Sequence, residues 1–155
     1  MKWTVLVAVG LVAFAVEARW VPAIEIRGVV PQLMLALVLY LALVNPPARV
    51  FAPAWCLGLA RDLLPGYYFG LYALSFMLAG AGLAWARKAL FQEHPVTRLA
   101  VFFAGGLAGG FLDLANAGGA VREGLMTVLG TAVYTALVAT PLSYVLDRRD
   151  DLFKL

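Results

Sequence analysis

Charged residues divide this chain into apolar segments of two alternating kinds. Three segments carry no Asp, Glu, Lys or Arg: residues 28–48, 63–86 and 124–146. Three shorter segments alternate with them and each ends at a charge: residues 3–16, 50–60 and 99–112. Because a helix that crosses a membrane takes about 20 mainly apolar residues, the pattern predicts six transmembrane helices. We place them at about 3–22, 28–45, 50–64, 67–88, 97–117 and 124–146, in a single transmembrane domain over residues 1–155.

The composition supports an all-α integral membrane protein, a bundle of six transmembrane helices. Hydrophobic residues make up 63% of the chain and charged residues 14%, against roughly 45–50% and about 25% in a globular domain. So few polar side chains cannot cover a soluble core of this size. The net charge of +3 does not indicate nucleic-acid binding, because the basic residues are scattered at segment ends and form no phosphate-binding patch.

The distribution of Lys and Arg predicts the orientation of the helices. With six crossings, both termini and the connections near residues 45–50 and 87–98 share one side. That side holds eight of the 12 basic residues: Lys2, Arg49, Arg87, Lys88, Arg98, Arg148, Arg149 and Lys154. The other side holds four: Arg19, Arg27, Arg61 and Arg122. Since cytoplasmic connections are enriched in Lys and Arg, we predict that both termini are cytoplasmic.

The first segment has two interpretations. Lys2, an apolar run and the small residues Ala13 and Ala15 are typical of a cleavable signal peptide. The leader has a single basic residue, however, and the five further membrane segments need no cleaved leader. We therefore predict an uncleaved first helix.

Three acidic residues lie at the ends of the odd-numbered segments. Helices 1, 3 and 5 run in the same direction, so Glu17, Asp62 and Asp113 are expected at similar depth near the outer face. An ionised side chain in lipid costs roughly 2.5–3.5 kcal/mol on insertion scales. Two explanations stay open: the acids mark helix ends at the membrane interface, or they form a functional cluster.

Asp62 is predicted to be a structural acid. Consecutive residues on a helix point about 100° apart, so Arg61 and Asp62 need not pair with each other. Asp62 is expected to accept hydrogen bonds from the turn at Pro65 and Gly66, or to pair with Arg27 of another outer connection.

Residue types that carry enzyme chemistry are scarce. His94 is the only histidine and Cys56 the only cysteine, which excludes a zinc site of the usual His/Cys type within one chain. The two serines lack a Gly-x-Ser-x-Gly setting, and Asp62 and Asp113 lack the flanking glycine pattern of intramembrane aspartic proteases. The sequence therefore predicts a non-enzymatic protein with no catalytic residue, metal or cofactor.

Glycines of the fifth segment form two overlapping small-xxx-small patterns on adjacent stripes: Gly105, Gly106, Gly109 and Gly110. In lipid, helices associate through close backbone contact at small residues. The stripes are interpreted as packing surfaces within the bundle or, for one of them, as a docking groove for a helix of another protein. The second interpretation expects that Leu at Gly106 or Gly110 weakens partner binding and leaves the monomer folded.

One stretch of the chain resembles a known family. Residues 58–76 read Gly-Leu-Ala-Arg-Asp-Leu-Leu-Pro-Gly-Tyr-Tyr-Phe-Gly-Leu-Tyr-Ala-Leu-Ser-Phe, a Gly-rich third helix ending in Asp-Leu-Leu, then a turn and a Gly-Leu-x-Ala-Leu opening of the next helix. Upstream, Arg27 and Pro31 stand at the start of the second helix. The pattern is similar to that of the rod-shape-determining protein MreD family, which does not require Arg61. The matching positions in the stretch are Gly58, Asp62, Gly66 and Gly70.

The resemblance implies a non-enzymatic scaffold subunit of the bacterial cell-elongation machinery, in the inner (cytoplasmic) membrane, that acts in rod shape and peptidoglycan synthesis. The implied partners are an MreC-like protein with one membrane helix and an extracytoplasmic coiled coil, the actin-like MreB, a SEDS glycosyltransferase and a class-B penicillin-binding protein. The groove of the fifth segment is then expected to bind the MreC-like helix.

The family's bundle is also similar to the six-helix substrate-binding subunits of energy-coupling-factor transporters. The alternative function is therefore a small-molecule-binding membrane subunit of a vitamin-type uptake transporter. Such a subunit needs an outward-facing pocket with polar groups from several loops. The predicted outer loops are short and mostly apolar, which favours the scaffold.

Overall fold

The computed structural model describes residues 2–19, 23, 29, 31–63, 69–87, 95–117 and 121–148. This part of the chain contains six α-helices and no β-strand: α1 (Lys2–Arg19), α2 (Leu33–Val44), α3 (Pro47–Asp62), α4 (Leu71–Ala86), α5 (Pro95–Ala117) and α6 (Val121–Asp147). The predicted all-α fold with six helices is confirmed for the described residues.

Two helices, α2 and α4, begin later than the hydrophobic pattern predicts, at Leu33 and Leu71. Before α2, Pro31 and Gln32 are not helical, and Gln32 is the N-cap with φ −95° and ψ 82°. Before α4, the N-cap Gly70 has a φ of 92°. Glycine adopts this left-handed conformation without the steric cost that a side chain would bring. The late starts therefore come from local backbone geometry, which the hydrophobic pattern does not report.

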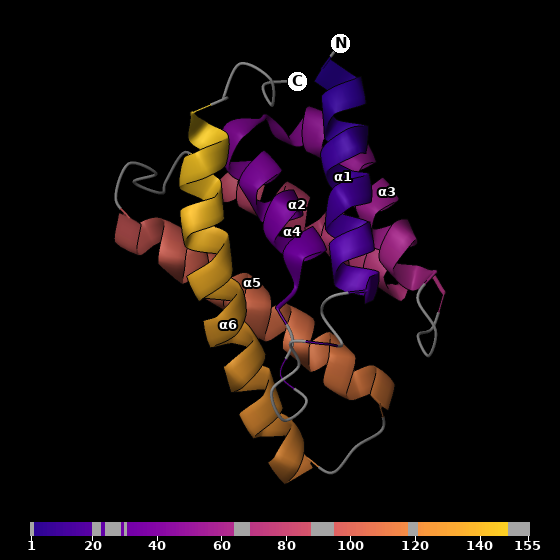
Figure 1. Ribbon diagram of the computed structural model, residues 1–155, viewed down its shortest axis with the longest axis vertical. Coiled ribbons are helices and arrows are strands. Elements are labelled where there is room, and N and C mark those ends of the chain that lie inside the picture. The colour runs from indigo at the N-terminus through magenta and orange to yellow at the C-terminus, as the bar shows by residue number, and fades with distance from the viewer. Residues whose placement is uncertain are drawn as a thin grey trace.

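The central helix of the bundle is α2. Its residues Met34–Leu43 are all buried, and it contacts each of the other five helices. Around it, α3 packs closely on α4, and α5 packs closely on α6, while α1 lies at the edge against α2 and α3. Figure 1 shows this arrangement, with α5 crossing α6 obliquely. Because protein covers every side of α2, its apolar residues need no polar face.

The connection between α2 and α3 is fixed by three consecutive residues. Asn45 ends α2, where its backbone N–H donates to the carbonyl oxygen of Leu41 at 2.9 Å and its side-chain Nδ2 donates to the same oxygen at 3.2 Å. Pro46 is the N-cap of α3 and Pro47 is its first residue. A missing amide hydrogen is harmless at these positions, so the prolines start the new helix directly.

The outside of the bundle is apolar, and its interior holds polar side chains. Large apolar side chains are exposed on every helix apart from α2; examples are Val7, Trp55, Leu78, Phe111 and Leu137. Buried polar residues are Glu17, Gln32, Asn45, Arg61, Asp62, Thr131, Thr135 and Ser143. Soluble proteins rarely expose so much contiguous apolar surface. This distribution fits a protein surrounded by lipid.

Two helices in the described part of the chain are long and apolar enough to cross a membrane, over Val96–Ala115 in α5 and Gly124–Asp147 in α6. The apolar helices α2 and α4 are shorter, with 12 and 16 residues. The start of α1 and the end of α6 lie at the same end of the molecule (Figure 1), as an even number of crossings requires. The side of the membrane that this end faces stays a prediction.

Candidate functional site

Arg61 connects the ends of three helices inside the bundle. Its guanidinium forms ion pairs with Glu17 of α1 and with Asp113 of α5, the latter with 3.3 Å between Nη2 and Oδ1. The side chains of Arg61 and Glu17 are only 4% and 3% exposed, and that of Asp113 is 25% exposed. Two of the three acids singled out in the sequence, Glu17 and Asp113, are thus brought together by a basic residue of α3, the helix that carries the remaining acid.

Gln32 and Tyr72 supply further hydrogen bonds to these acids. The Nε2 of Gln32 donates to Oδ2 of Asp113 at 2.6 Å, and the hydroxyl of Tyr72 donates to Oδ1 of the same carboxylate. Oε2 of Glu17 accepts the backbone N–H of Met34 at 2.9 Å. Each carboxylate therefore receives donors from at least two other parts of the fold.

The same group of residues reaches the sixth helix. The backbone N–H of Gln32, which is fully buried, donates to Oγ1 of Thr135 at 3.1 Å. All six helices are then joined at one place, counting Gln32 as the N-cap of α2. We call this group the polar cluster; its members are Glu17, Gln32, Arg61, Tyr72, Asp113 and Thr135.

The polar cluster contains two carboxylates and one guanidinium. Buried charges are stable only when they are paired and hydrogen-bonded, and removal of one partner leaves the other uncompensated. The guanidinium carbon of Arg61 also lies 4.8 Å from the centre of the Tyr72 ring, a favourable cation–π arrangement. That ring packs edge-to-face on Phe76, with 5.9 Å between ring centroids. The contacts hold the charged groups at fixed positions.

Asp62, next to Arg61, has a separate task. Its two carboxylate oxygens accept the backbone N–H groups of Tyr72 at 3.1 Å and of Ala73 at 3.0 Å. The first N–H groups of a helix have no partner within the helix, so Asp62 caps α4 from the end of α3. The hydrogen bonds come from the first turn of α4. The alternative donors expected from the sequence, at Gly66 and Arg27, lie outside the described residues.

Gly58 allows a close approach between the backbones of α3 and α4. A Cβ atom at this position would stand 2.5 Å from the carbonyl oxygen of Tyr72 and 2.7 Å from the backbone nitrogen of Ala73. Backbone atoms cannot move aside as a flexible side chain can. Within the stretch that resembles the MreD family, Gly58 and Asp62 therefore form one structural unit, in which Gly58 brings the two helices together and Asp62 caps the second.

The glycine stripes of α5 both face other helices of this chain. A Cβ at Gly106 would lie 2.7 Å from the Cα of Ala132, and one at Gly110 would lie 3.1 Å from the Cα of Val128, both in α6. This stripe is the packing surface between α5 and α6. It is not a spare groove for a foreign helix, which corrects the second interpretation of these glycines.

The other stripe of α5 faces the start and middle of α2. A Cβ at Gly105 would lie 3.4 Å from Cγ of Leu39, with another atom of that side chain still nearer. At Gly109 it would lie 2.6 Å from Cδ of Gln32. Gly109 thus leaves room for the side-chain amide of Gln32. That amide donates to Asp113, which lies one helical turn after Gly109 on α5. The expectation that one stripe stays free is wrong, because α2 fills the second one.

A second ion pair holds α5 to α6 at their other ends. Arg98 pairs with Asp147, and its guanidinium carbon lies 5.3 Å from the centre of the Tyr144 ring. The two charged side chains are 19% and 25% exposed. The pair is therefore mostly buried, and it adds to the contacts that α5 and α6 make along Gly106 and Gly110.

Sequence patterns did not single out three members of the polar cluster: Gln32, Tyr72 and Thr135. One signal was present for Gln32, since an amide within the charge-free segment 28–48 must find a partner inside the bundle. Among the described residues, no group of three or more His, Cys, Asp or Glu side chains could hold a metal ion. Cys56 is exposed, and His94 lies outside the described residues.

Comparison with known families gives one match. The sequence model for the rod shape-determining protein MreD matches residues 1–115, a range that includes every member of the polar cluster apart from Thr135. Curated proteins and solved structures give no match. The matched range covers well over half of the chain, and it contains the Gly58–Asp62 unit and the polar cluster that joins the helices. The chain therefore belongs to the MreD family of rod shape-determining membrane proteins.

Proposed function

We propose that this chain is a non-enzymatic scaffold subunit of the bacterial cell-elongation complex and binds the single membrane helix of an MreC-like protein. The family match over residues 1–115 carries the proposal. A role in rod shape determination follows from the family, and the scaffold role and the partner are the steps that we add.

The polar cluster supports a scaffold over an enzyme. Its carboxylates accept hydrogen bonds from Arg61, Gln32, Tyr72 and the Met34 amide. A group of this kind sets the relative positions of helices, because breaking one buried contact leaves a charge uncompensated. A general acid or base would instead need access to a substrate proton. The cluster thus defines a rigid body on whose outer surface a partner can bind.

We further propose six crossings of the inner membrane, with both termini in the cytoplasm. The common end of α1 and α6, the apolar outer surfaces and the eight-to-four distribution of basic residues support this topology. The polar cluster then lies toward the outer face. Glu17 is buried and paired with Arg61, and Asp113 is mostly buried and paired with the same residue, which reduces the cost of charges near the hydrocarbon.

The partner helix must use an outward face, because α2 and α6 occupy both glycine stripes of α5. Three exposed positions sample separate faces: Val7 on α1, Leu78 on α4 and Val133 on α6. Cysteine at each, combined with cysteines along the MreC-like helix and replacement of Cys56 by Ala, permits disulfide cross-linking in membranes. We expect one face to give cross-links at helical spacing along the partner. Equal cross-linking from all three faces, or none, contradicts a defined docking site.

Co-purification and cell shape test the proposed function itself. Deletion of the gene should produce round cells, and the wild-type chain should restore rods and co-purify with the MreC-like protein. At whichever of the three positions cross-links to the partner, replacement of the Val or Leu by Trp should leave the chain folded. This variant should neither restore rods nor co-purify with the MreC-like protein. A control Trp on another face should retain both. Co-purification with an ATPase and normal rods after deletion would instead favour the vitamin-type transporter subunit.

A further inference from the structure

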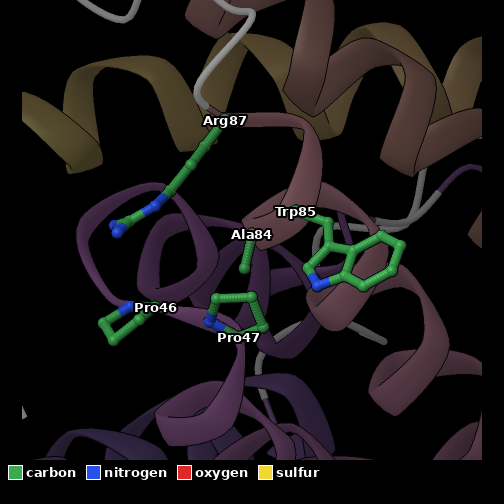
Figure 2. Close-up of a pocket in the computed structure, with 5 residues that line it drawn as sticks. All are labelled: Pro46, Pro47, Ala84, Trp85 and Arg87. Carbon is green, nitrogen blue, oxygen red and sulfur yellow. The ribbon is translucent and has the colours of Figure 1, made fainter.

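A pocket lies at the end of the bundle opposite the polar cluster. Its volume is about 520 Å³, and it is lined by Pro46, Pro47, Ala84, Trp85 and Arg87. The prolines belong to the α2–α3 connection, and the other residues form the last turn of α4. Figure 2 shows the Arg87 side chain and the Trp85 ring on two sides of the pocket, with Ala84 and Pro47 between them. We propose that this pocket binds the phosphate headgroup of an anionic membrane phospholipid.

The chemistry of the lining matches a lipid phosphate at the membrane surface. A guanidinium binds phosphate oxygens with two parallel N–H donors, and Arg87 supplies this group. Trp85, in the last turn of the apolar helix α4, is 81% exposed. Tryptophan is enriched at the headgroup level of membranes, where its ring meets apolar chains and its N–H meets water. Arg49, exposed at the start of α3, adds positive charge at the same end of the bundle.

An apolar strip on α4 leads away from the pocket and favours a lipid over a free phosphate. Leu74, Leu78, Gly82 and Trp85 follow one another at helical spacing. Leu74 is 55% exposed and Leu78 59%. A Cβ atom added at Gly82 would meet nothing within 4 Å, so a shallow notch separates Leu78 from Trp85. An acyl chain can lie along this strip while the headgroup occupies the pocket.

The length of the strip fits one leaflet of a bilayer. From Leu74 to Trp85 the helix rises about 16 Å at ~1.5 Å per residue. Half of a bilayer core of ~30 Å is about 15 Å. Basic pockets between membrane helices on the cytoplasmic side are typical sites for anionic lipids, and the distribution of Lys and Arg predicts that this end faces the cytoplasm.

Lipid titration of the full-length chain tests the proposal. The purified chain, stripped of lipid in a neutral detergent, is titrated with phosphatidylglycerol, and bound lipid is measured by native mass spectrometry. We expect saturable binding of one lipid that Arg87→Gln weakens about 10-fold, the loss of one charge-assisted contact. Arg49→Gln is the matched control; it removes a charge at the same end but not from the pocket, and should change affinity less than about 2-fold.

A second variant separates the acyl strip from the headgroup pocket. Gly82→Leu fills the notch and leaves every charge in place, and it should weaken binding without unfolding the chain, because open space surrounds this position. Phosphatidylcholine should bind less tightly than phosphatidylglycerol. Soluble glycerol 3-phosphate should not compete.

Three results would overturn the lipid site. These are equal effects of Arg87→Gln and Arg49→Gln, equal affinity for the two lipids, or full competition by glycerol 3-phosphate, which would indicate a site for a soluble phosphate. Normal rod shape and partner binding in Arg87→Gln would leave the proposed scaffold function intact, so the two proposals fail separately.

Discussion

Arg61 and Asp62 are neighbours in the chain, yet their side chains bind different parts of the bundle. Arg61 reaches Glu17 and Asp113 of two other helices, whereas Asp62 caps the first turn of α4. Consecutive side chains on a helix diverge by about 100°, which lets one end of α3 serve both tasks. The end of α3 thus ties the α3–α4 pair to α1 and α5 through ion pairs, in addition to the packing of both helices on α2.

The cap formed by Asp62 predicts a specific stability loss. Asp62→Ala should lower the free energy of unfolding in detergent by about 1–3 kcal/mol, because two buried N–H groups of α4 lose their acceptor. Asp62→Asn retains one carbonyl oxygen and should lose less. The measurement is SDS- or heat-induced unfolding, followed by helical circular dichroism. If Ala and Asn variants both match the wild-type stability, the cap is not a structural element.

The ion pair of Arg61 with Glu17 predicts coupled mutations. Arg61→Gln should destabilise the fold by about 3–5 kcal/mol, because Glu17 is left as an unpaired buried charge. Glu17→Gln in the same chain removes that charge, so the double variant should be more stable than the sum of the single losses implies. A double-mutant cycle in the same unfolding assay measures the coupling. Losses that add within about 0.5 kcal/mol would contradict direct pairing.

The two glycine stripes of α5 predict different responses when an alanine at Gly109 or at Gly106 is combined with Gln32→Ala. Gly109→Ala should destabilise the bundle by about 1–3 kcal/mol, because its methyl group meets the side chain of Gln32. Gln32→Ala has its own cost, the hydrogen bond to Asp113, but it empties that space, so the double variant should lose less stability than the sum of the two single losses.

Gly106→Ala serves as the comparison for this pair. Its methyl group meets the backbone of Ala132, so the losses from Gly106→Ala and Gln32→Ala should simply add. Equal behaviour of the two glycine variants in the presence of Gln32→Ala would show that the packing of α5 differs from the one described.

The proposed topology predicts the side from which cysteines react. With Cys56 replaced by Ala, a cysteine at Leu63, a residue that is 70% exposed at the end of α3, should react with a membrane-impermeant maleimide in intact spheroplasts. A cysteine at Arg49, exposed at the start of α3, should react only after the membrane is opened. The reverse pattern would invert the proposed orientation, and labelling of both from outside would exclude a crossing by α3.

Much of the fold could be predicted from the sequence, because the hydrophobic pattern and the prolines report on length and ends. The number of helices and the ends marked by Pro46 and Pro47 follow from such local signals. The starts of α2 and α4 did not, since they depend on the conformations of Gln32 and Gly70.

The neighbours of each helix could not be predicted in the same way. A helix that is apolar on all sides carries no polar face to show which side turns inward. The role of Arg61 as the connector, the use of Thr135 and the filling of both stripes of α5 depend on how helices are rotated against one another. These features follow from the contacts between helices in the folded structure, which the hydrophobic pattern of a single helix does not report.

The burial of α2 has a consequence for the order of assembly during synthesis. The ribosome makes α2 before α3 to α6, so this helix must wait in the bilayer without most of the elements that later cover it. Its uniformly apolar surface allows this, because lipid can stand in for each absent neighbour. An unpaired charge is costly in the bilayer, so the charged residues cannot remain there without partners. Glu17 is made first, its partner Arg61 follows with α3, and Asp113 follows only with α5. We therefore expect the nascent chain to become stable in steps: Glu17 and Arg61 pair within α1 to α3, Asp62 gains its donors with α4, and Asp113 completes the cluster with α5.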